Sequence, residues 1–128
     1  MPRLAALTII VPDYDEAIDY FTSALGFALL EDTRLNESKR WVRVAPPGAE
    51  TAILLAQPKN EKECAAIGHQ TGGRVGFFLE TDDFDRDHAR MTAAGVTFEE
   101  SPRTEPYGKV AVFRDAFGNL WDLIEPRR

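Results

Sequence analysis

The second half of this 128-residue chain repeats the pattern of its first half, and this repeat limits the possible folds more than any other feature. A shift of 70 residues places the acidic start of one expected helix on the start of another, so that Asp13 meets Asp83. With one residue deleted, Gly26 at the end of the first helix meets Gly95 at the end of the second. A repeated order of elements indicates repeated structural units, so the sequence predicts two similar modules.

Each module is expected to contain one strand, one helix and three further strands. In the first half, an apolar run predicts a strand over 4–11, and Asp13 followed by Glu16 has the form of a helix-capping box before a helix over 14–25. Strands are expected over 27–33, 40–45 and 51–56. The second half predicts a strand over 74–80, a helix over 84–94, a turn over 103–108 and strands over 96–100, 109–114 and 120–124.

The predicted fold class is α+β, with two tandem βαβββ modules over about 4–57 and 74–126 in a single domain. The polar segment 58–73 joins the modules and is interpreted as a loop with a short helical turn at its start. One helix covers only one face of each sheet, so the other faces could curve around a cavity that holds a small molecule.

Asp122 places a carboxylate in the middle of an otherwise apolar expected strand, which is an unusual position for a charged side chain. The turn over 115–119 has the Asp, Gly and Asn residues that a tight hairpin requires. If Trp121 and Leu123 face the helix, Asp122 lies on the opposite face between apolar neighbours. We expect the same face to carry Phe113 and Phe78, and we expect Asp122 to meet water, a ligand's donor or an arginine such as Arg43.

Charged and aromatic side chains on these faces are the candidates for ligand binding. Asp122 and Glu80 could recognise a ligand or form an acid–base pair. They could equally make an internal salt bridge, with Arg43 or Arg74 nearby, or be charges at the rim of the cavity in water. The aromatic residues could form a wall for a flat ligand or belong to the core, and Tyr107 could lean over the cavity mouth or pack as a turn residue. The predicted ligand-binding residues are Asp122, Glu80, Arg43, Trp41, Phe78, Phe113 and Tyr107.

Composition excludes some classes of partner. A net charge of −6 argues against nucleic acid, whose phosphates would be repelled. No apolar run approaches the length of a membrane span, and the single cysteine cannot form an internal disulfide, so we expect a cytoplasmic protein. Cys64 lacks a nucleophile signature, His69 lies in the polar loop, and His88 is expected on the surface of an acidic helix.

At the level of motifs the chain resembles the vicinal oxygen chelate superfamily, which contains glyoxalase I, bleomycin-resistance proteins and extradiol dioxygenases. The resemblance is carried by the repeated element order, Val-Pro-Asp at 11–13, Leu-Gly-Phe at 25–27 and Asp-Ala-Phe-Gly-Asn at 115–119. It covers nearly the whole chain and implies a glyoxalase-like fold. It also implies a homodimer, because members often pair modules across chains.

The chain departs from the family's metal-binding pattern, and this departure indicates a metal-free member. Enzymes of the family hold a divalent metal with four side chains, and these positions fall on Ala6, Ile53, Gly76 and Asp122. Only Asp122 has a ligand atom, whereas a catalytic zinc usually has three protein ligands. We therefore expect no cofactor, and a protein that binds a small molecule in its cavity, with a cationic aromatic ligand fitting the acidic composition. The alternatives are a glyoxalase-like lyase or dioxygenase-like enzyme with a non-standard site, and a binding module that serves a larger system.

Overall fold

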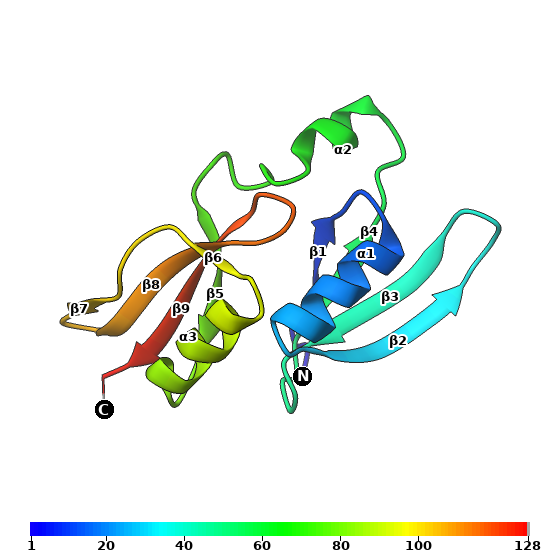
Figure 1. Cartoon of the computed structure of the whole chain (residues 1–128). Coiled ribbons are helices and arrows are strands. Elements are labelled where there is room, and N and C mark those ends of the chain that lie inside the picture. The colour runs from blue at the N-terminus through cyan, green and yellow to red at the C-terminus, as the bar shows by residue number, and fades with distance from the viewer. Residues whose placement is uncertain (128) are drawn as a thin grey trace. The chain divides into compact units, whose positions relative to one another are not determined.

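The computed structural model describes residues 1–127, which form two compact units that meet in the sequence between Ile67 and Gly68. Each unit is a mixed β-sheet with a helix packed on one of its faces (Figure 1). The first unit has the βαβββ element order and the second has the same order with one additional short strand, so the predicted α+β fold built from two such modules is confirmed. The grouping of both units into a single domain stays a prediction. No helix within 1–127 has the length and apolar character needed to cross a membrane.

The sheet of the first unit has the strand order β1-β4-β3-β2. Strand β1 runs parallel to β4, and the two other neighbouring pairs are antiparallel. Helix α1 and its continuation η1 follow β1, and a short helix α2 follows β4. The bounds of these elements are β1 Ala6–Ile10, α1 Tyr14–Asp19, η1 Tyr20–Ala24, β2 Ala28–Arg34, β3 Arg40–Ala45, β4 Ala52–Ala56 and α2 Glu61–Ala66.

The first helix begins as predicted and then changes its winding. The carboxylate of Asp13 accepts a hydrogen bond from Glu16 N at 2.8 Å and caps the helix. The expected continuous α-helix becomes a π-helical turn over η1. Within it, the Thr22 hydroxyl donates to Ile18 O at 2.7 Å, and such bonds back to the preceding turn distort helices. Gly26 ends the helix with a φ of 74°.

Alternation along the strands separates the core of the first unit from its other face. Ile9 and Val42 both lie beside Leu55 in the sheet, and all three are buried below helix α1. Thr8 and Leu54, which pair with each other, point to the opposite side. We call the sheet face opposite the helix the open face of each unit.

The sheet of the second unit has the strand order β5-β9-β8-β6, and β7 pairs with the first residues of β8, from Gly108 to Val110. Strand β5 is parallel to β9, and the remaining pairs are antiparallel. The segment 103–108, expected to be only a turn, thus begins with a short strand. The bounds are β5 Val75–Glu80, α3 Phe84–Ala93, β6 Thr97–Phe98, β7 Arg103–Glu105, β8 Gly108–Arg114 and β9 Leu120–Pro126.

The register of the last hairpin corrects one predicted face. Asp115 N donates to Asn119 O across the turn, and this pairing places Phe113 opposite Trp121. The two rings stack with their centroids 5.6 Å apart, and Phe113 is fully buried. The prediction that Phe113 shares a face with Asp122 is therefore wrong, because Val112 is the residue opposite Asp122. Phe113 belongs to the core on the helix side of the sheet.

Candidate ligand-binding site

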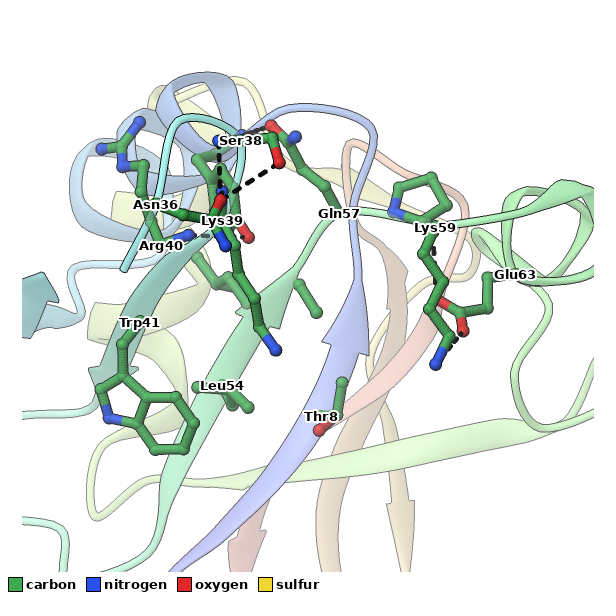
Figure 2. A pocket seen from close by; sticks show the side chains of 14 residues that line it. Thr8, Asn36, Ser38, Lys39, Arg40, Trp41, Leu54, Gln57, Lys59 and Glu63 are labelled. Atoms are coloured by element: carbon green, nitrogen blue, oxygen red, sulfur yellow. Dashed lines mark hydrogen bonds and ion pairs between the residues drawn. The ribbon is translucent and has the colours of Figure 1, made fainter. Parts of the chain in front are cut away.

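A cavity of about 440 Å³ lies within the first unit, at the end of its sheet where β3 begins and β4 ends (Figure 2). The side chains that border it come from three parts of the unit: the strands, the β2–β3 loop, and the segment that leads from β4 into α2. They include Thr8, Trp41 and Leu54 from the strands, Asn36 and Lys39 from the loop, and Gln57, Lys59 and Glu63 from the last segment.

Part of the cavity wall is apolar and belongs to the open face. Trp41 is 39% exposed, which is a large apolar surface for a side chain that points out of a sheet. Leu54 lies in the neighbouring strand, beside Thr8. Figure 2 shows Trp41, Leu54 and Thr8 on the same side of the cavity. An aromatic ring next to an aliphatic side chain offers a surface on which a flat ligand can stack.

The β2–β3 loop carries a positive charge to the cavity. Asn36 Oδ1 accepts hydrogen bonds from Ser38 N at 2.9 Å and from Lys39 N at 2.8 Å, which fixes the loop. The Lys39 side chain points into the cavity toward Leu54 and Thr8 (Figure 2). Its ammonium group makes no ion pair within residues 1–127.

The other charged groups at the cavity are neutralised by the protein itself. Arg40 makes salt bridges to Asp15 at 3.0 Å and to Asp32 at 2.7 Å, and its hydrogen bond lowers the pKa of Asp32 below the ordinary value. Lys59 Nζ lies 3.7 Å from Glu63 Oε2. Among the cations that line the cavity, Lys39 is therefore the one that no described carboxylate pairs with, so its charge is left for a ligand.

Gln57 joins the cavity to the start of the helix. Its Oε1 accepts a hydrogen bond from Tyr14 N at 3.0 Å and thus satisfies one of the free N–H groups of helix α1. The amide nitrogen of the same side chain donates to no residue within 1–127. Because Gln57 is half-buried at the cavity, that nitrogen is placed to donate to a ligand.

The open face of the second unit carries Asp122. Phe78 lies beside it in the parallel strand and is 66% exposed. Asp122 Oδ1 is shielded from solvent and accepts no hydrogen bond from any described residue. Burial raises the pKa of Asp122, the positive charge of Arg103 opposes that rise, and the negative charge of Glu100 adds to it.

Arg103 organises the polar groups near Asp122. Its guanidinium forms salt bridges with Glu100 at 3.1 Å and with Glu105, and it donates to the Tyr107 hydroxyl at 3.3 Å. Glu100 also accepts a hydrogen bond from Val112 N at 2.8 Å, which fixes this cluster to strand β8. Tyr107 thus belongs to a bonded network on the second unit, although its ring is largely exposed.

The predicted site residues fall into separate places. Asp122, Phe78 and Glu80 share the open face of the second unit, and Tyr107 contacts Arg103 beside it. Trp41 borders the cavity of the first unit. Arg43, expected as a partner of Asp122, belongs to the first unit and donates to Glu31 at 3.2 Å within its own sheet. Sequence reasoning missed Lys39 and Gln57, whose roles depend on how two loops meet the sheet, and it missed Arg103, which it placed only at the start of a turn.

The parallel strand pairs also correct the predicted metal position in the first half. Thr8 pairs with Leu54 as Phe78 pairs with Asp122, so the counterpart of Asp122 is Leu54 and not Ile53. Leu54 has no atom that can bind a metal ion. The family's four metal positions in this chain are thus Ala6, Leu54, Gly76 and Asp122, and only the last offers a ligand atom.

Packing as well as chemistry bears on Gly76. A Cβ atom built there would lie 2.4 Å from the Thr71 methyl group, so a larger residue at this position requires the Thr71 side chain to move. Thr71 is itself held by a hydrogen bond from its hydroxyl to Arg74 O at 2.7 Å. The residues at the family's metal positions therefore do not fit a divalent ion. Elsewhere in residues 1–127, no three His, Cys, Asp or Glu side chains gather as a metal site would require.

His88 is not the surface residue that the sequence suggested. Its ring lies between two aromatic rings, with centroids 5.4 Å from Phe84 and 4.1 Å from Phe98. Its Nε2 is shielded from solvent and bonds to no described residue. The apolar neighbours come from α3 and β6, so His88 is part of the packing between them and not of a ligand site.

Comparison with known proteins gives consistent results along the whole chain. The family described as "Glyoxalase/Bleomycin resistance protein/Dioxygenase superfamily" matches residues 3–123. An uncharacterized protein of Shewanella frigidimarina (strain NCIMB 400) is 48% identical over 121 residues, which cover 93% of this chain and 90% of that protein.

Two solved structures resemble the chain in fold and in sequence. The crystal structure of UcmS2 matches with a TM-score of 0.84 and 31% identity, over 97% of this chain and 98% of that one. TnmS3, described as an antibiotic binding protein from Streptomyces sp. CB03234, matches with a TM-score of 0.80 and 31% identity, over 99% of this chain and 98% of that one.

Proposed function

Because the chain belongs to the glyoxalase/bleomycin resistance protein/dioxygenase superfamily, we propose that it is a metal-independent binding protein for a small molecule. The observation that carries this proposal is the cavity of about 440 Å³ beside the open face of the first unit. That volume lies within the roughly 300–1,000 Å³ range of small-molecule sites. A single domain-sized chain of this kind can hold and sequester a ligand without altering it.

The character of the cavity supports binding. Trp41 and Leu54 provide a stacking surface, while Lys39 and Gln57 add polar groups that can orient a ligand. Sites for small molecules commonly combine an apolar wall with a few convergent polar groups. The description of TnmS3 as an antibiotic binding protein is in keeping with such a role.

We assign a second ligand-contacting surface to the open face of the second unit. Phe78 offers a large exposed ring, and Asp122 beside it has an oxygen without a partner among the described residues. Glu80 and Tyr107 add acceptor and hydroxyl groups nearby in the same unit. A ligand's donor group would satisfy Asp122, which removes the cost of a shielded, unpaired carboxylate oxygen.

Binding is favoured over metal-assisted catalysis because of the residues at the four family positions. Three of them, Ala6, Leu54 and Gly76, have no ligand atom, and a catalytic zinc usually takes three protein ligands. A lyase or dioxygenase would therefore need a metal site built from other residues. The homodimer and the cytoplasmic location stay predictions.

Isothermal titration with a flat neutral probe, 9-anthracenemethanol, tests the proposed function. We expect one-to-one binding that is unchanged by EDTA and weakened about tenfold in Trp41→Ala, because an aromatic contact is worth roughly 1 kcal/mol beyond its area. Leu35→Ala is the matched control, since Leu35 is exposed in the same loop region but does not border the cavity.

Two outcomes would overturn the proposed function. The first is an absence of binding by the unaltered protein. The second is binding that EDTA abolishes and that a single divalent metal ion restores, which would favour an enzyme with a metal site.

A further inference from the structure

We infer that the cavity of the first unit selects a flat ligand with an anionic or strongly hydrogen-bond-accepting group, a class opposite to the one that the acidic composition suggests. This inference rests on the proposed function, because it names the chemical class that the same cavity takes. It follows from counting which polar atoms at the cavity are already used by the protein and which are left for a ligand.

The acceptors at the cavity are largely occupied. Asn36 Oδ1 takes hydrogen bonds from Ser38 N and Lys39 N, and Gln57 Oε1 takes one from Tyr14 N. The carboxylate of Glu63 accepts from Lys59 N at 3.2 Å and pairs with the ammonium group of the same lysine. A ligand that brings only donors would find these oxygens already bonded.

The donors, by contrast, are left over. Lys39 Nζ has no carboxylate partner within residues 1–127 and points into the cavity beside Leu54 (Figure 2). Gln57 Nε2 also has no acceptor among the described residues, because its own oxygen is committed to the helix. Two donors at a cavity that the Trp41 ring also borders match a flat molecule that carries a carboxylate, a phenolate or a carbonyl.

Local charge therefore differs from global charge. The whole chain has a formal net charge of −6, which favours cations at long range. At the cavity, Arg40 is paired with Asp15 and Asp32 and Lys59 is paired with Glu63, so Lys39 is the lining cation without a carboxylate partner among the described residues. The charge of Lys39 therefore decides which bound ligand is preferred, because salt at 0.1 M screens the more distant charges of the protein over about 10 Å.

Three fluorescent probes of one shape separate the ligand class from the binding function. These are 9-anthracenecarboxylate, 9-anthracenemethanol and 9-anthracenylmethylammonium, which differ mainly in charge. We expect the carboxylate to bind about tenfold more tightly than the neutral alcohol at low salt, a difference of roughly 1.4 kcal/mol. We expect the ammonium probe to bind more weakly than the alcohol, and the advantage of the carboxylate to shrink at high salt.

Two substitutions assign that advantage to named atoms. Lys39→Gln should remove most of the preference for the carboxylate and leave binding of the alcohol nearly unchanged. Gln57→Glu keeps an oxygen that can accept from Tyr14 N but replaces the free amide donor with a carboxylate oxygen, so it should weaken the carboxylate probe and strengthen the ammonium probe. Lys62→Gln is the control, because it removes one lysine charge from α2 at a position that does not border the cavity.

Each outcome decides between the two proposals. If the carboxylate binds no more tightly than the alcohol, or if Lys39→Gln weakens it no more than Lys62→Gln does, the ligand class is wrong while the binding function stands. If the ammonium probe binds most tightly, the ligand class is reversed. If none of the three probes binds, the proposed function and this inference both fail. Circular dichroism of each variant confirms that it is folded.

Discussion

The indole Nε1 of Trp121 donates a hydrogen bond to Asp115 Oδ2 at 3.0 Å, from the core of the second unit to the turn before its last strand. The carboxylate of Asp115 also accepts from Phe117 N and Asn119 N at 2.9 Å, and from Asn119 Nδ2 at 3.0 Å. It is only 4% exposed. One buried carboxylate therefore satisfies four donors and joins the turn to the aromatic core.

Asp115→Asn should destabilise the protein by about 3 kcal/mol. The substitution replaces one acceptor oxygen with an NH₂ group, which would face N–H groups that now donate to the carboxylate and would leave them without an acceptor. Urea unfolding followed by circular dichroism measures this loss. Asp82→Asn, an exposed site whose carboxylate pairs with Arg86 at the surface, should change the free energy of unfolding by less than about 0.5 kcal/mol. Equal effects of the two substitutions would contradict the role given to Asp115.

His88→Phe should stabilise the protein by about 1 kcal/mol. The replacement keeps an aromatic ring between Phe84 and Phe98 and removes a shielded nitrogen that bonds to no described residue. Thermal unfolding of both proteins compares their stability, and His69→Phe at an exposed loop position makes the same exchange without burial. A lower melting temperature for His88→Phe would show that this nitrogen is satisfied in solution.

Asp122 should make stability depend on pH in a defined direction. Burial raises the pKa of Asp122 in the folded state, so the native protein holds this proton more tightly than the unfolded chain does. The associated stability is fully present below the unfolded pKa and is lost as pH rises through the folded pKa.

Asp122→Asn removes this dependence, because an amide does not ionise. Relative to the unaltered protein, the variant should gain stability as pH rises through the raised pKa of Asp122, and urea unfolding at several pH values measures the difference. A variant that loses relative stability as pH rises would mean that attraction to Arg103 outweighs burial and the repulsion from Glu100.

Metal titration should give no tight site. Isothermal titration with zinc, nickel, manganese or iron(II) is expected to show no stoichiometric binding tighter than about micromolar, which corresponds to roughly 8 kcal/mol. Three of the four family positions lack ligand atoms, so Asp122→Asn should leave the metal content of the purified protein unchanged. A tight one-to-one site that this substitution removes would contradict the metal-independent function.

The repeat was enough to predict the fold, because helix caps and strand alternation are local signals. The strand Arg40–Ala45 and the start of α3 at Phe84 lie where the sequence placed them. The errors arose where the answer depends on pairing between distant segments. The face of Phe113 depends on the register across the last turn, and the equivalence of Asp122 with Leu54 depends on parallel pairing.

The cavity was predictable in kind but not in its residues. A free sheet face and the aromatic character of Trp41 were visible in the sequence. The roles of Lys39 and Gln57 were not, because each depends on which of its polar atoms the surrounding backbone already binds. Such bonds between loops and helices carry no regular spacing that a sequence pattern could reveal.

The contact between Gly76 and Thr71 bears on how this chain could change over evolutionary time. A Cβ atom introduced at position 76 would lie 2.4 Å from the Thr71 methyl group, so a histidine there requires the Thr71 side chain to leave the position that its hydrogen bond to Arg74 O holds. A metal ligand at this position is thus coupled to a rearrangement of the neighbouring turn, which favours divergence among ligands over a gain of metal binding.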